Sequence, residues 1–207
     1  MRQYDGVSAP DDQIYEKYQA RAIAETNQLG HEIATWVGEH HPSQTPVIGT
    51  GHPLADIFLL KYRPAAAEVQ EGVAFFGRAG QAVLKSIERL RIDPLKLYGS
   101  LCLKLDIEPG EDDLERSRGW LARELHITQP GIVVAMGVEA VEFVNSLQFP
   151  LAGPVETTTG QVQRLTPTID LLAVPDIDQS LNDSGAKREF WAAFKVLGEW
   201  YENLPPY

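Results

Sequence analysis

Four short, continuous apolar runs constrain the fold of this chain more than any other feature of its sequence. They span residues 57–60, 97–103, 132–136 and 171–174. Apolar and polar residues do not alternate within the runs, which is typical of strands buried on both faces of a parallel sheet. Only Gly99 and Ser100 interrupt the second run. The sequence therefore predicts four central strands.

Apolar residues with helical spacing lie between and after these runs. They recur three, four or seven residues apart, as expected for helices with one buried face. The positions are Val83, Ile87 and Leu90, then Leu114, Leu121 and Leu125, then Ala140 and Val144, and finally Phe190, Phe194, Leu197 and Tyr201. Strands that alternate with helices predict a three-layer α/β/α sandwich around a four-stranded, mostly parallel sheet. Residues 161–165 are expected to add a strand that turns back into the fourth run.

The region before the first run is predicted to be a helical extension over residues 1–45. Apolar residues recur four apart from Ile14 and continue at Leu29 and Ile33, which indicates helix. Gly30 is expected to separate two helices, and residues 40–43 are expected to break the second. Residues 46–207 are then predicted to form the α/β/α domain as one structural unit.

Composition limits the class of protein. The chain has 207 residues, of which 43% are apolar, so it can bury a sizeable core as one domain. No apolar run approaches the ~20 residues of a membrane span, and the first residues lead into no apolar stretch that would indicate a secretory signal. Cys102 is the single cysteine, which excludes an internal disulfide and a multi-cysteine metal site within one chain. We therefore expect a cytoplasmic protein without cofactor or metal.

The net charge of −11 predicts weak affinity for nucleic acid, because an acidic chain repels phosphates on average. The charge is uneven, however. Between Lys61 and Lys104 there are eight basic residues and only four acidic ones. A local basic face therefore remains possible, and much of it is interpreted as the solvated side of a helix.

In a fold of this class, ligands bind beyond the carboxyl ends of the strands. The most informative segment there is residues 75–80, in which Gly77 and Gly80 stand three apart at a predicted helix start. Backbone amides at such a position favour anions. The candidate anion or phosphate contacts are Gly77, Arg78, Gly80 and Lys104.

Two segments after the first run carry a family resemblance. Lys61-Tyr62-Arg63-Pro64-Ala65 is followed by residues 72–80, Gly-Val-Ala-Phe-Phe-Gly-Arg-Ala-Gly. At this spacing they resemble the Gly-Glu-Ala-Pro-Gly and Gly-x-Pro-Phe-Val-Gly-Arg-Ala-Gly motifs of the uracil-DNA glycosylase superfamily, particularly its bacterial and archaeal iron–sulfur branch. The resemblance continues at Tyr98, Lys104, residues 130–137 and residues 187–191, and it covers residues 47–201.

The resemblance implies an α/β/α fold and a site that flips a base onto an aromatic ring, here Phe75. In the family, an acidic residue positions water, an asparagine reads the uracil edge and a histidine donates to the leaving uracil. These three positions hold Tyr62, Leu101 and Asp176. The cluster cysteines are also replaced, and the two positions that can be aligned hold Leu105 and Ser117.

The three replacements remove the required chemistry. The reference pKa of tyrosine is about 10, so Tyr62 cannot act as a carboxylate at neutral pH. Leu101 makes no hydrogen bond with a base, and an ionised Asp176 would repel a uracil anion. The resemblance therefore indicates a diverged uracil-DNA glycosylase-like protein without ordinary uracil excision. It is expected to bind DNA, a nucleobase or a nucleotide weakly, in a retained pocket for a base, a nucleotide or another small ligand.

Alternatives remain open at this stage. The chain could be an active DNA glycosylase of altered substrate in base-excision repair, or a scaffold for an unknown protein partner. Phe75 could be core instead of a stacking platform, Tyr62 could close the pocket, Asp176 could cap a turn and Glu68 could be a solvated loop acid. The candidate pocket comprises Tyr62, Arg63, Pro64, Glu68, Phe75, Leu101 and Asp176.

Overall fold

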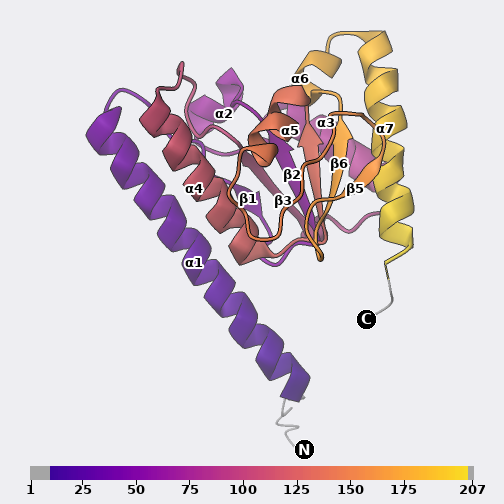
Figure 1. The fold of residues 1–207 in the computed structure, drawn as a ribbon, viewed down its shortest axis with the longest axis horizontal. Coiled ribbons are helices and arrows are strands. Elements are labelled where there is room, and N and C mark those ends of the chain that lie inside the picture. The colour runs from indigo at the N-terminus through magenta and orange to yellow at the C-terminus, as the bar shows by residue number, and fades with distance from the viewer. Residues whose placement is uncertain (1–9, 205–207) are drawn as a thin grey trace, which may run out of the picture.

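A six-stranded sheet forms the centre of the molecule in the computed structural model, which describes residues 10–204 (Figure 1). The strand order is β1-β3-β2-β4-β6-β5. The strands are β1 (Thr50–Gly51), β2 (Ile57–Lys61), β3 (Leu97–Leu101), β4 (Ile132–Met136), β5 (Val162–Arg164) and β6 (Asp170–Val174).

The four predicted strands are confirmed as the parallel centre of this sheet, in the order β3-β2-β4-β6. The expected number of four is wrong for the whole sheet, because short antiparallel strands are added at both edges. Strand β5 is the added strand predicted from residues 161–165. Strand β1 has only two residues and was missed, because two residues are too few for a periodic pattern.

Helices cover both faces of the sheet (Figure 1). One face packs against α4 and α5 through a core that includes Phe58, Val133 and Leu121. The other face packs against α3 and α7 through a core that includes Ile57, Val134 and Phe194. This arrangement confirms the three-layer α/β/α prediction. The helices are α1 (Pro10–His40), α2 (Ala66–Glu71), α3 (Arg78–Arg89), α4 (Glu111–Thr128), α5 (Val138–Asn145), α6 (Ile177–Ser180) and α7 (Ser184–Glu202), with a short 3-10 helix over Pro94–Lys96.

The N-terminal extension is one helix, α1, which lies along the outer side of α4 as a further layer (Figure 1). Leu29, Ile33 and Val37 are buried with Trp120 and Ile127 of α4. The expected break at Gly30 is wrong. A glycine inside a helix costs only about 0.5–1 kcal/mol relative to alanine, and the buried stripe of α1 continues across it. The helix ends at His40, where the break was predicted.

The division at residue 45 stays a prediction, and residues 1–9 of the predicted extension lie outside the described residues. Toward its N-terminus α1 extends past α4 (Figure 1) and exposes Ile14, Tyr15 and Tyr18, each more than half accessible. Within the described chain, every helix is too short or too polar to cross a bilayer.

Candidate functional site

An open hollow of about 590 Å³ lies at the carboxyl edge of the parallel strands. The segments that follow β2 and β6, the start of α3 and one residue of α5 form its walls. Its lining residues are Tyr62, Arg63, Pro64, Ala65, Ala66, Ala67, Phe76, Arg78, Ala79, Glu139, Asp176, Asp178, Gln179, Leu181 and Asn182. Four of the seven candidate pocket residues are among them, together with Arg78. Glu68, Phe75 and Leu101 are not.

Leu101 is fully buried as the last residue of β3. It packs with Val47 and Ala74 and against Phe75, away from the hollow. Its assignment to the pocket is therefore wrong. An apolar side chain at this position gains more from burial in the core than from exposure at a polar surface.

Phe75 is partly buried and packs on the strand that ends in Leu101. Its ring lies so close to Gly99 that a Cβ atom at that position would be only 2.6 Å from a ring carbon. Its backbone has φ of 59°, an unusual conformation for a phenylalanine. Its neighbour Phe76 is 48% exposed and lines the hollow. Of the two open alternatives, the packing of Phe75 corresponds to core.

Glu68 holds this unusual backbone in place. The fully buried carboxylate of Glu68 accepts hydrogen bonds from the backbone N–H of Phe75 at 2.5 Å and of Ala65 at 2.7 Å. These two bonds tie the start of α2 to the segment that precedes α3. The interpretation of Glu68 as a solvated loop acid is wrong, because its role depends on long-range partners that the sequence does not reveal.

Lys61 is the last residue of β2, and its buried ammonium joins two carboxylates. Its Nζ atom lies 2.8 Å from Oε2 of Glu68 and 2.5 Å from Oδ2 of Asp178. The same atom lies 5.6 Å from the centroid of the Phe75 ring, over the ring. Lys61 occupies the position of the first glycine in the family motif. The sequence carries a signal for this role of Lys61, because a long cationic side chain stands where the family has glycine, which has no side chain.

Asp176 follows β6 and faces the hollow. Its Oδ1 atom accepts a hydrogen bond from the backbone N–H of Gln179 at 2.9 Å, so it caps α6 as one of the alternatives expected. Burial raises the pKa of Asp176, and the nearby Asp178 raises it further. Glu139 brings a second carboxylate close, because a Cβ atom on Gly137 would lie 3.4 Å from Oε2 of Glu139 and 3.6 Å from Oδ2 of Asp176.

Two arginines and one tyrosine also contribute to the polar wall. Arg78 donates from Nη2 to Oδ1 of Asn182 at 3.2 Å. Arg63 pairs with the exposed Glu108 at 2.9 Å and lies over the ring of Tyr62. Tyr62 also packs edge-on against Phe143. The ring is thus part of the wall, and the hollow beside it stays open.

Lys104 does not reach this hollow. Its Nζ atom is buried beneath β3 and lies 2.7 Å from Oε2 of Glu124 and 2.5 Å from Oγ of Ser100. The prediction that Lys104 contacts a phosphate is therefore wrong, because its ammonium is already paired inside the protein.

The two glycines at the start of α3 serve the packing of the loop. Gly77 has φ of 87°, a conformation that favours glycine. Gly80 is buried, and a Cβ atom there would lie 1.7 Å from the carbonyl oxygen of Phe75. This close approach of the Phe75 carbonyl requires a glycine at position 80 whether or not an anion binds there. The role of Gly77 and Gly80 as phosphate contacts therefore stays a prediction.

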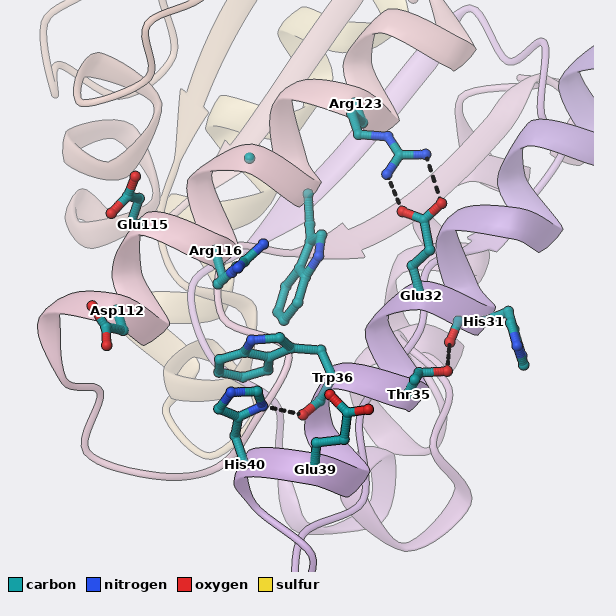
Figure 2. A pocket seen from close by; sticks show the side chains of 12 residues that line it. His31, Glu32, Thr35, Trp36, Glu39, His40, Asp112, Glu115, Arg116 and Arg123 are labelled. Carbon is teal, nitrogen blue, oxygen red and sulfur yellow. Dashed lines mark hydrogen bonds and ion pairs between the residues drawn. The ribbon is translucent and has the colours of Figure 1, made fainter.

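A larger hollow of about 960 Å³ lies between α1 and α4, and only these two helices line it. Figure 2 shows Trp36 and His40 stacked at one end and Glu32 facing Arg123 at the other. Acidic and basic side chains alternate around it, and no strand end contributes a residue. Its position is unlike the sheet-edge location of ligand sites in α/β folds, so we assign the candidate site to the smaller hollow.

Leu105 and Ser117, the two positions that align with cluster cysteines, lie just inside this helix pair. Both are buried, and Trp36 and Trp120 fill the space beside them, apart from a void of about 10 Å³. Burial raises the pKa of the Cys102 thiol, which disfavours the thiolate that metals bind. The described residues contain no group of three or more histidine, cysteine or acidic side chains arranged to hold a metal ion.

The purified protein is expected to be colourless and free of stoichiometric iron, because an iron–sulfur cluster needs about four thiolates and the chain has one. Metal analysis and a visible absorption spectrum of protein purified without oxygen provide the check. Iron bound in proportion to the chain, with cluster absorbance, would contradict the expectation.

The parallel order β3-β2-β4-β6, with a hollow beyond the carboxyl ends of β2 and β6, defines a three-layer α/β/α protein whose candidate site lies at the edge of the sheet. Over residues 48–195 the chain matches the family model of the uracil DNA glycosylase superfamily, and it belongs to that superfamily. A type-4 uracil-DNA glycosylase of Archaeoglobus fulgidus is 23% identical over 167 residues, which cover 77% of this chain and 84% of the relative. A type-4 uracil-DNA glycosylase of Sulfurisphaera tokodaii is 28% identical over 105 residues, 48% of each chain.

Proposed function

We propose that this protein is a diverged uracil-DNA glycosylase-like protein that does not excise uracil and that binds an unpaired base or nucleotide in the hollow beside Phe76. One observation carries the proposal. Leu101 and Phe75 pack against each other, and the Lys61 ammonium lies over the Phe75 ring. A base that followed the family pattern would have to occupy this same space.

The chemistry of the remaining positions supports the loss of excision. Base excision requires donors aimed at the negative charge that develops on the leaving base. Asp176 offers an acceptor where the family has a donor, and Tyr62 replaces the carboxylate that positions water. The ion pairs of Lys61 with Glu68 and Asp178 also leave its ammonium committed within the protein.

The lining of the hollow supports binding. Phe76 is an exposed aromatic ring on which a base can stack, and Arg78 at the start of α3 supplies a cation for a phosphate. The carboxylates of Asp176 and Glu139 accept hydrogen bonds from the edge of a base.

Replacement of Phe76 by alanine is expected to weaken nucleotide binding by about 5- to 150-fold, because base–aromatic stacking contributes roughly 1–3 kcal/mol. Titration calorimetry with nucleoside monophosphates measures the effect. Leu84→Ala is the matched control, since Leu84 is an equally exposed apolar residue of α3 that does not line the hollow. An absence of binding by the wild type would refute the part of the proposal that concerns binding and would favour the scaffold alternative. The surface available to a protein partner is then the exposed apolar group Ile14, Tyr15 and Tyr18 on α1.

Double-stranded DNA is expected to bind weakly and to dissociate at ~0.15 M salt, where charges beyond ~8 Å are largely screened. The net charge of −11 opposes phosphates, and the logarithm of affinity falls by about 0.9 per neutralised phosphate for each unit of log salt. The paired Lys61 and Lys104 cannot contribute to that count. Fluorescence anisotropy across a salt series gives the slope. Tight binding that persists at physiological salt would show that the local basic residues outweigh the overall charge.

A further inference from the structure

We infer that Asp176 makes the hollow selective for a base with two adjacent N–H donors, as guanine presents, over uracil. This inference rests on the proposed binding of a base or nucleotide in the hollow and names the class of base. It is carried by the free acceptor positions of Asp176 and by the carboxylate that lies next to it.

Asp176 has acceptor capacity that the protein does not use. Two backbone N–H groups donate to its carboxylate, that of Gln179 to Oδ1 at 2.9 Å and that of Asp178, and they use only part of its acceptor capacity. An ionised carboxylate offers about four acceptor positions and binds two parallel N–H groups side by side. The cap on α6 fixes the orientation of the carboxylate, and Asp176 lines the hollow, so little reorganisation is needed when a base binds.

Its neighbours strengthen the preference for donors. Glu139 lies near the same point beside Gly137 and adds a second acceptor, whereas Asp178 is paired with Lys61, which it shares with Glu68. The edge of guanine carries an N–H and an amino group next to each other, which match the two oxygens of one carboxylate. The edge of uracil has one N–H between two carbonyl oxygens, and those oxygens would face the carboxylates unpaired.

A comparison of GMP, IMP and UMP tests the inference, because these three ligands share ribose and phosphate. IMP keeps the ring N–H of GMP and lacks only its amino group. Hydrogen bonds to charged groups are stronger than neutral ones, so we expect GMP to bind at least about tenfold more tightly than IMP, and UMP to bind most weakly. Asp176→Asn should remove the difference between GMP and IMP. Asparagine still caps a helix, so the fold should remain intact, which a thermal unfolding curve verifies.

Two further variants separate the site from the surface. Glu139→Gln should reduce GMP affinity, whereas Glu142→Gln, on the same helix but outside the hollow, should not. Equal affinity for GMP, IMP and UMP, abolished by Phe76→Ala, would overturn the selectivity and leave the proposed binding function standing. A lack of binding by all three nucleotides would overturn both.

Discussion

Replacement of Glu124 by alanine is expected to destabilise the protein by about 3–5 kcal/mol, the usual cost of leaving a buried charge without its partner. Glu124 is 2% exposed and accepts hydrogen bonds from Lys104, Ser100 and Tyr98, the first two at 2.7 Å. Its removal leaves the Lys104 ammonium buried between β3 and α4 without a charged partner and without access to water. Urea unfolding followed by circular dichroism measures the loss as a lower midpoint at an unchanged slope.

Two variants show that the unpaired charge causes this effect. The double replacement Lys104→Met with Glu124→Met should be less destabilising than Glu124→Ala alone, because apolar residues often substitute well for a whole buried ion pair, and both variants remove the acceptor of the Ser100 and Tyr98 hydroxyls equally. Glu115→Ala, on the exposed face of the same helix, should change stability by no more than about 0.5 kcal/mol. A decrease of less than about 1 kcal/mol in the free energy of unfolding of Glu124→Ala would contradict the conclusion that the Lys104–Glu124 pair is shielded from water and stabilises the fold.

The central strands and the layers were predictable because burial on both faces leaves a local signature. Neighbouring residues of β2 point to opposite faces, and Phe58 and Leu59 enter different cores. Both must therefore be apolar, and a continuous run results. That signature does not account for β5, whose residues are exposed or half-buried. It also fails for β1, which exists because it pairs with β3 over two residues, and such pairing leaves no periodic pattern.

The roles of charged residues could not be predicted, because their partners are distant in the sequence. Lys61 and Asp178 are 117 positions apart and meet at 2.5 Å. Glu68 could be read as a solvated loop acid and Lys104 as a phosphate contact, yet each is buried together with a partner of opposite charge. Tyr62 and Asp176, which the alignment of motifs selected, both line the hollow. The alignment misplaced Leu101, because an apolar replacement removes the reason for a side chain to face the ligand.

The purified wild-type protein is expected to release no uracil above background from single- or double-stranded DNA. Loss of one preorganised donor typically costs about 10²–10³ in rate. Here the donor is replaced by Asp176, the reader of the base edge by the buried Leu101, and the catalytic carboxylate by Tyr62. Effects within one site do not add simply, yet two such losses are expected to lower the rate below ordinary detection. An oligonucleotide with one uracil, followed by alkaline cleavage of abasic sites, gives the measurement, with an active uracil-DNA glycosylase as positive control.

The restoring variant Tyr62→Glu, Leu101→Asn and Asp176→His should recover little activity, because Lys61 still lies over the Phe75 ring. An asparagine at position 101 would also be buried among Val47 and Ala74 without a polar partner among the residues of that cluster. Addition of Lys61→Gly is expected to help only if Phe75 can then turn toward a base. Enzyme-dependent cutting by the wild type, lost on replacement of Asp176, would overturn the proposal in favour of an active glycosylase of altered substrate. Such activity should increase as the pH falls, because burial raises the pKa of Asp176 and a carboxyl group can donate a hydrogen bond to a leaving base only when it is protonated.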